Sequence, residues 1–142
     1  MEPSYATGLV WFRRDLRALD HAALYHALTQ CQQVHCVFVF DTDILAPLPR
    51  ADRRVEFIRE SLVELDAHLR ELSGHAQGGL IVRHAAAADA LPQLAQSLGV
   101  NAVFTNHNDE PQALQRDAAV RTQLARSGVA LHTYKDHTLL ER

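Results

Sequence analysis

Cysteine is scarce in this sequence, which has only Cys31 and Cys36 among its 142 residues. Two thiols so close together cannot form the disulfide framework of a small secreted domain, nor supply the ligands of a structural zinc site. Cys36 lies within an apolar segment, where a cysteine behaves as a small core hydrophobe. We therefore expect both thiols to be free and buried, as in a protein of a reducing compartment.

Long apolar runs are missing too, since none reaches the roughly 18 residues that a membrane-spanning helix needs. The first residues also lack the basic and then apolar order of a secretory leader. Basic residues are not in excess, because 14 lysines and arginines stand against 17 acidic residues, a formal net charge of -3. A chain of this balance lacks the electrostatic footprint of nucleic-acid binding. We expect a cytoplasmic domain without membrane contact, with any DNA held by another domain.

Glycine is infrequent, and two common nucleotide-binding loops are missing. The sequence contains neither GxGxxG nor GxxxxGK, and its glycines stand only at positions 8, 74, 78, 79, 99 and 128. The nine histidines are scattered, with no HExxH motif and no compact cluster with cysteine, so we expect no metal site. No spacing indicates a Ser-His-Asp or Cys-His arrangement, and we assign no catalytic residue.

What the sequence does contain is a regular alternation of strand-like and helix-like segments. Five short apolar runs predict strands, and their near-continuous apolar character favours burial on both faces. Four helix-like stretches separate them, an order typical of a parallel sheet. The expected fold is α/β, a doubly wound five-stranded parallel sheet with helices on both faces. The five predicted strands are residues 8–12, 34–40, 80–83, 102–105 and 129–132.

The clearest predicted helix covers residues 52–72, where apolar residues recur at steps of three and four. A later helix is predicted to begin with Asp89 as its capping residue and Pro92 in its first turn. Three glycines stand where helices should end before the next strand, and a residue with positive φ is useful there. These glycines are Gly74, Gly99 and Gly128.

Arginines are concentrated after the first predicted strand, in the segment Arg13-Arg14-Asp15-Leu16-Arg17. Ligands of an open parallel sheet bind at the carboxyl ends of the strands, where the strand order reverses. The three arginines could hold an anionic ligand through forked hydrogen bonds. They could instead fix the strand-to-helix turn by pairing with nearby acids, and we favour this structural pairing. The candidate acids are Asp15, Asp20 and Asp41.

A longer stretch around these arginines resembles a known family. Residues 9–17, LVWFRRDLR, followed by Asp20 and Ala22-Ala23-Leu24, closely resemble the opening signature of DNA photolyases and cryptochromes. The resemblance continues in family order and spacing over essentially the whole chain. The other matching segments are Val39-Phe40-Asp41, Arg54, Phe57-Ile58, Glu60-Ser61-Leu62, Leu65-Asp66, Ala102-Val103-Phe104, Asn106, Glu110-Pro111, Arg116-Asp117, Lys135-Asp136 and Leu139-Leu140.

The resemblance implies a domain organisation and a function. Residues 1–134 would form a Rossmann-like α/β antenna domain, and residues 135–142 would begin the interdomain linker. The helical domain that binds the catalytic FAD would lie outside this sequence. The parent protein would be a deoxyribodipyrimidine photolyase, a carbon-carbon lyase that uses FAD and near-ultraviolet or blue light to split pyrimidine dimers in damaged DNA. This chain would serve it as a light-harvesting or accessory domain, with the helical FAD-binding domain as its partner.

The family's antenna pigment is a reduced folate, a deazaflavin or a flavin. Folate-binding members carry asparagine and then glutamate on the fourth helix, where this sequence has Gln112 and Ala113. Alanine cannot accept a hydrogen bond, and the loss of a buried acceptor costs about 1 to 3 kcal/mol. The resemblance therefore favours a deazaflavin or flavin over a reduced folate, and an empty pocket stays open as well. The implied cofactor-binding residues are Asp41, Arg54, Asn108 and Glu110.

Other interpretations remain open at this point. Glu110 could be an acid that complements a helix dipole, and Asp41 could be a strand-end cap. The chain could belong to a cryptochrome-type photoreceptor, in which light is sensed instead of used for repair. It could also be a stand-alone nucleotide-binding α/β protein whose arginines 13, 14 and 17 hold phosphate, although the missing glycine-rich loop argues against this function.

Overall fold

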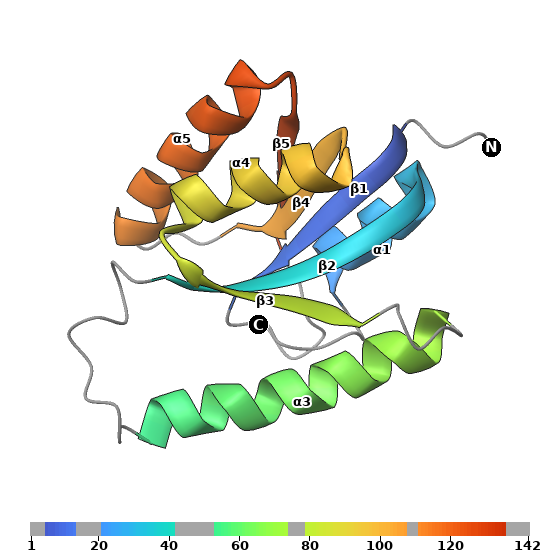
Figure 1. Cartoon of the computed structure of the whole chain (residues 1–142), viewed down its shortest axis with the longest axis vertical. Coiled ribbons are helices and arrows are strands. Elements are labelled where there is room, and N and C mark those ends of the chain that lie inside the picture. Colours follow the sequence, from blue (N-terminus) through green and yellow to red (C-terminus); the bar gives the residue numbers. More distant parts are fainter. Residues whose placement is uncertain (1–4, 14–20, 42–52, 74–78, 108–110, 136–142) are drawn as a thin grey trace.

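The computed structural model describes residues 5–13, 21–41, 53–73, 79–107 and 111–135. These residues form one five-stranded parallel sheet with the strand order β3-β2-β1-β4-β5 (Figure 1). In chain order, β2 and β3 are added on one side of β1, and β4 and β5 are added on its other side. The predicted doubly wound α/β fold is thus confirmed. The strands are β1 (Tyr5–Phe12), β2 (Cys31–Asp41), β3 (Leu80–Ala85), β4 (Ala102–Asn106) and β5 (Ala130–Tyr134).

Helices cover both faces of the sheet, as alternate residues of β1 demonstrate. Leu9 and Trp11 belong to the core cluster that α4 and α5 complete, whereas Val10 and Phe12 belong to the cluster that α1 and α3 complete. This separation follows from the two-residue period of a strand, which turns successive side chains to opposite faces. The helices are α1 (Ala22–Gln30), α3 (Arg53–Ser73), α4 (Ala87–Leu98) and α5 (Pro111–Arg126) (Figure 1).

Burial differs between the centre and the edges of the sheet. All five residues of β4 are buried, and so are the last five of β1. The edge strands do not follow the prediction of burial on both faces, because Arg83 and His84 of β3 and Ala130 of β5 are exposed. An edge strand has a neighbour on one side only. Residues 80–83 of β3 are therefore only partly buried or exposed, although their sequence is mostly apolar.

The helix boundaries agree with the sequence pattern at most positions. The helix predicted for residues 52–72 is α3, and Gly99 and Gly128 adopt φ of 70° and 73°, the left-handed conformation that favours glycine. The predicted Asp89 cap is wrong, because α4 begins at Ala87 with Ala86 at the N-cap and no side-chain capping bond. Alanine is the best helix former, so the helix begins three residues earlier than a cap at Asp89 predicts, and Asp89 lies in its first turn.

Both cysteines are free and buried, as predicted. Pro92 lies inside α4 and not in its first turn, and Gly74 is outside the described residues. None of the described helices is both long and apolar enough to cross a membrane. Within the described residues, no group of three or more histidine, cysteine or acidic side chains is placed to hold a metal ion.

Candidate functional site

The strand order creates a switch point between β1 and β4, the two central neighbours of the sheet. From the carboxyl end of β1 the chain continues to α1 on one face, and from that of β4 it continues to α5 on the other. The two connections diverge there, which is where open α/β sheets bind ligands. The residues at the ends of β1 and β4 therefore lie where a ligand is expected.

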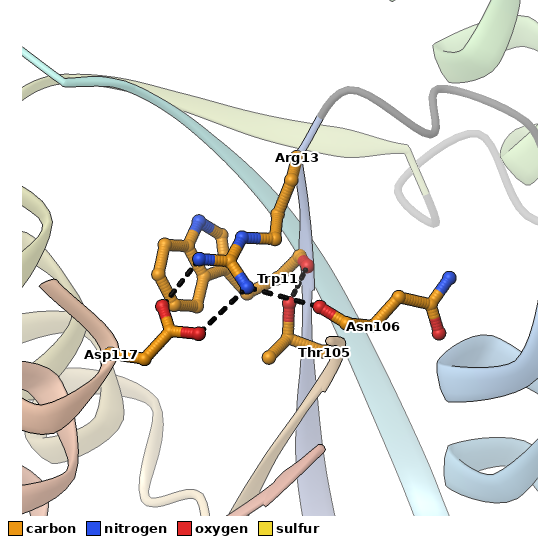
Figure 2. A network of polar contacts seen from close by, with 5 residues as sticks. All are labelled: Trp11, Arg13, Thr105, Asn106 and Asp117. Atoms are coloured by element: carbon orange, nitrogen blue, oxygen red, sulfur yellow. Dashed lines mark hydrogen bonds and ion pairs between the residues drawn. The ribbon is translucent and has the colours of Figure 1, made fainter. Parts of the chain in front are cut away.

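Arg13, the residue that follows β1, is buried and forms a two-pronged ion pair with Asp117 of α5 (Figure 2). Its Nη1 donates to Asp117 Oδ2 at 3.0 Å, and its Nη2 donates to Oδ1. Nη1 also donates to the main-chain oxygen of Asn106 at 3.0 Å. The arginine therefore has the structural pairing that we favoured, but its acid is Asp117 and not Asp15, Asp20 or Asp41. Arg14 and Arg17 lie outside the described residues.

The ring of Trp11 lies beneath the guanidinium of this ion pair, as Figure 2 shows. The Cζ atom of Arg13 is 4.4 Å from the centroid of the indole, and that of Arg116 is 5.4 Å from it. Both distances fall within the range of cation–π attraction. The hydroxyl of Thr105 donates to the main-chain oxygen of Trp11 at 2.8 Å. We call these residues the switch-point network: Trp11, Arg13, Thr105, Asn106 and Asp117.

Asn106 connects the network to the start of α1. Its side-chain Oδ1 accepts a hydrogen bond from the main-chain N–H of Ala23 at 2.9 Å, and the asparagine is buried. His21 caps the same helix, because its Nδ1 accepts from the N–H of Leu24 at 3.1 Å. The His21 ring also packs on Phe12, with centroids 4.6 Å apart. The beginning of α1 is thus held against the ends of both central strands.

The four predicted cofactor-binding residues occupy different places relative to this network. Asp41 is the last residue of β2, so it lies at the same carboxyl edge as Arg13, and its main chain pairs in register with Ala85. Arg54 is in the first turn of α3, and the side chains of both residues are outside the description. Asn108 and Glu110 lie outside the described residues altogether. The structure therefore shows that Asp41 lies at the carboxyl edge of the sheet. That the four residues lie together in one site stays a prediction.

The positions that a folate-binding relative would use fall on α5. Gln112 is in the first turn of this helix, and Ala113 follows it with its side chain buried. A buried methyl group offers no hydrogen-bond acceptor at position 113. The preference against folate that the resemblance implies stays a prediction.

Sequence reasoning did not assign a role to Asn106 or Asp117 of the network, or to His21, which caps α1. Asn106 and Asp117 do stand in the segments that carry the family resemblance, which was the available signal. Their partners could not be named from spacing, because Arg13 and Asp117 are separated by 104 positions. Only the strand order brings β1, β4 and α5 together.

Known proteins are similar to this chain in sequence and in fold. The sequence model of the family described as DNA photolyase matches residues 8–142. A cryptochrome DASH of Natronomonas pharaonis is 33% identical over 138 residues, a match that covers 94% of this chain and 28% of the relative. Cryptochrome-2 of Gallus gallus is 32% identical over 135 residues, which covers 95% of this chain and 22% of the relative.

Among solved structures, an archaeal photolyase from Sulfolobus tokodaii aligns with a TM-score of 0.81 and 30% identity. The alignment covers 94% of this chain and 30% of the photolyase, which is described as holding two FAD molecules, with the implication of a novel light-harvesting cofactor. This chain therefore spans less than a third of the length of each of these relatives. Because the family match extends over nearly all of its residues, and the fold agrees, the chain belongs to the DNA photolyase family as its N-terminal α/β domain.

Proposed function

We propose that this domain binds a flavin or deazaflavin pigment and passes the absorbed light energy to a photolyase-type parent protein. The observation that carries the proposal is the switch point. There the buried network joins the carboxyl ends of β1 and β4, the strands from which the two connections diverge. The similarity to a photolyase described with two FAD molecules and a light-harvesting cofactor supports the same ligand class. The absence of GxGxxG from the sequence argues against an ordinary dinucleotide enzyme.

Four residues are the proposed contacts of the pigment. Asp41 stands at the carboxyl end of β2, one strand away from the switch point, and Asn108 follows β4 by two positions. Their oxygens are suited to accept hydrogen bonds from a flavin or deazaflavin ring, and Arg54 is suited to an anionic side arm. Glu110 immediately precedes α5 and would add a further acceptor. In this proposal the protein orients the ring and excludes water, while absorption belongs to the pigment.

A reduced folate fits the chain less well. Position 113 carries a buried alanine on α5, and the glutamate that folate-binding members place there is missing. A pterin donor that faces this position would lose its acceptor, which costs about 1 to 3 kcal/mol for a buried group. We therefore place folate behind flavin and deazaflavin.

The parent protein is proposed to carry the chemistry outside this chain. Residues 1–134 would be the antenna domain and 135–142 the start of the linker, a boundary that agrees with the end of β5 at Tyr134. A separate helical domain would bind the catalytic FAD and the damaged DNA, because this chain has a formal net charge of -3. The alternative of a cryptochrome-type photoreceptor draws on the relatives named cryptochromes, whose sequences share this domain. We place the protein in the cytoplasm.

A titration of the purified chain tests the proposal. FMN, FAD, a deazaflavin and a reduced folate are added separately, and binding is followed through pigment fluorescence and through Trp11, the one tryptophan of the sequence. We expect a flavin or deazaflavin to saturate and the folate to bind more weakly. ATP and NAD serve as controls for the stand-alone nucleotide binder, which they would stabilise against heat. Stabilisation by ATP or NAD without pigment binding would contradict the proposal.

Two variants test the proposed contacts. Arg54→Ala and Glu110→Ala should weaken pigment binding and leave the melting temperature nearly unchanged. Arg126→Ala is the matched control, since this arginine is exposed in the last turn of α5, at the amino edge of the sheet. Equal losses of stability and binding in Arg54→Ala would instead assign that residue to the fold.

A further inference from the structure

We infer that Arg83 and Arg121 keep the two open edges of the sheet from pairing with a second copy of this chain. β3 and β5 are the outermost strands of the sheet, so within the described residues each has a strand neighbour on one side only. The outer side of such a strand presents main-chain N–H and C=O groups that another strand can bind. Here an arginine side chain donates to a main-chain carbonyl of each edge strand. The inference does not depend on the proposed pigment.

The outward groups of β3 follow from the alternation along a strand. Residues two positions apart direct their N–H and C=O groups to the same side, and neighbouring residues direct them to opposite sides. The N–H of Leu80 donates to Oδ1 of Asp66 in α3 at 2.7 Å, so β2 does not use it. Val82 and His84 therefore direct their main-chain groups away from β2 as well. Nη1 of Arg83 occupies the Val82 carbonyl at 3.1 Å.

The outward groups of β5 are assigned in the same way. The N–H of Ala130 bonds to the residue before β4 at 3.4 Å, and the oxygen of Tyr134 bonds to the residue after β4 at 2.7 Å. Even-numbered residues of β5 therefore face β4, while Leu131 and Thr133 face outward. Arg121 of α5 donates to the Leu131 carbonyl at 3.5 Å, a longer contact than the one on β3. Both edges thus have an outward carbonyl that an arginine occupies.

A second copy of the chain fits the edge of β3, because a strand can pair with its own copy antiparallel around a twofold axis. The middle of the strand is accessible, since Val82, Arg83 and His84 are all exposed. Two registers centre the pair there. One pairs Val82 with Val82, and the other pairs Val82 with His84 and sets the two copies of Arg83 opposite each other.

Both registers need the Val82 carbonyl that the guanidinium of Arg83 occupies. The second register also places like charges directly opposite each other, which destabilises a cross-strand pair. Arg83 therefore opposes pairing in two ways, through a hydrogen bond that must be broken and through its charge. Charged side chains on edge strands are a general means of preventing association between sheets.

The test uses Arg83→Thr and Arg121→Ala in the 142-residue chain. Threonine favours a strand and alanine favours a helix, so each replacement suits its element. Arg126→Ala is the matched control, because it removes the same charge from an exposed residue in the last turn of α5, outside both edge strands. Sedimentation equilibrium over a wide range of concentration measures association, and amide hydrogen exchange identifies the edge that pairs. The unfolding midpoint verifies that each variant is folded.

For β3, we expect Arg83→Thr to form a dimer whose Kd is at least about tenfold lower than that of any dimer of the wild type or Arg126→Ala. The amides of Val82 and His84 should become protected from exchange in this dimer, because they face outward. A folded Arg83→Thr that associates no more than Arg126→Ala would overturn the inference for this edge. Association without protection of these two amides would overturn it equally.

For β5, Arg121→Ala should likewise associate more tightly than Arg126→Ala, with protection of the amides of Leu131 and Thr133. Association equal to that of the control, or association that leaves both amides unprotected, would overturn the inference for β5. Because each edge is tested by its own variant, a variant that fails to fold leaves the other edge as the test.

Discussion

Arg13 and Asp117 form a buried two-pronged ion pair across 104 positions of sequence, which joins the end of β1 to α5. The pair lies at the reversal of strand order, with the indole of Trp11 beneath the guanidinium. Charges in such a place are retained only when they are well paired, because desolvation of each is expensive. The location of this pair at the candidate ligand site is what connects the stability of the domain with its proposed function.

Removing one partner of the pair should destabilise the domain strongly. We expect Asp117→Leu to lower the free energy of unfolding by about 3–5 kcal/mol, because it leaves the Arg13 charge buried and uncompensated. The double variant Arg13→Met and Asp117→Leu should lose much less than the sum of the single losses. Urea unfolding of all four proteins of this cycle provides the measurement. Additive losses would mean that the two side chains contribute independently.

The sequence was sufficient to predict the fold but not the contacts at the switch point. The near-continuous apolar runs at 8–12 and 102–105 predict strands that are buried on both faces, and the structure buries them. The partner of Arg13 could not be identified, since it depends on which strands are neighbours. Of the pigment contacts proposed from family resemblance, Asp41 is placed at the expected edge, while Asn108 and Glu110 are outside the described residues.

Local patterns misled at the start of α4 and at the edge strand β3. Asp89 has the residue type of a helix cap, yet α4 begins at Ala87 because Ala87 and Ala88 favour helix. The apolar run of β3 resembles a central strand, but its position at the edge leaves Arg83 exposed. The first error arises because the helix propensity of the alanines outweighs a possible cap, and the second arises because hydropathy does not encode the neighbours of a strand.

Gly8 is required by close packing within β1. A Cβ at this position would lie 2.5 Å from Sγ of Cys31 and 3.1 Å from Cε1 of Phe104. Gly8→Ala should therefore destabilise the domain by about 1–3 kcal/mol, the usual cost of overpacking a core. Thermal unfolding would show this loss. When Cys31→Ala has already removed the Sγ atom, adding Gly8→Ala should cost less stability than it does in the wild type. A Gly8→Ala variant as stable as wild type would contradict the packing described for β1.

Burial raises the pKa of the Cys36 thiol from 9.0 to about 12. The unfolded chain thus ionises this thiol at a lower pH than the folded chain. Its contribution to stability is complete below pH 9 and is lost as the pH rises from 9 toward 12. Comparison of wild type with Cys36→Ala should show that the wild type loses more stability over this alkaline window. Parallel pH profiles of the two proteins would contradict the burial of the thiol.

Asp66 of α3 supports the start of β3. Its Oδ1 accepts from the N–H of Leu80 at 2.7 Å, and its Oδ2 accepts from Nε of Arg70 at 2.9 Å. The Leu80 hydrogen bond, followed by the Arg70 interaction, lowers the pKa of Asp66 below 3.8. The stabilisation is present above pH 3.8 and is lost as the pH falls through the lowered pKa.

We therefore expect Asp66→Asn to lose about 1 kcal/mol at neutral pH and to be less sensitive to acid than wild type. Arg70→Gln is the control for the ion pair, which is largely exposed and should contribute little. Urea unfolding at neutral and acidic pH distinguishes the two interactions. A larger loss in Arg70→Gln than in Asp66→Asn would assign the effect to the ion pair.

The most direct test of pigment binding at the switch point is a crystal structure of the chain saturated with FMN or the deazaflavin. We expect the ring of the pigment at the carboxyl ends of β1, β2 and β4, above the Arg13–Asp117 pair and in contact with Asp41, Arg54, Asn108 or Glu110. A pigment bound at the amino edge of the sheet or on an outer helix face would contradict this location and the proposal built on it.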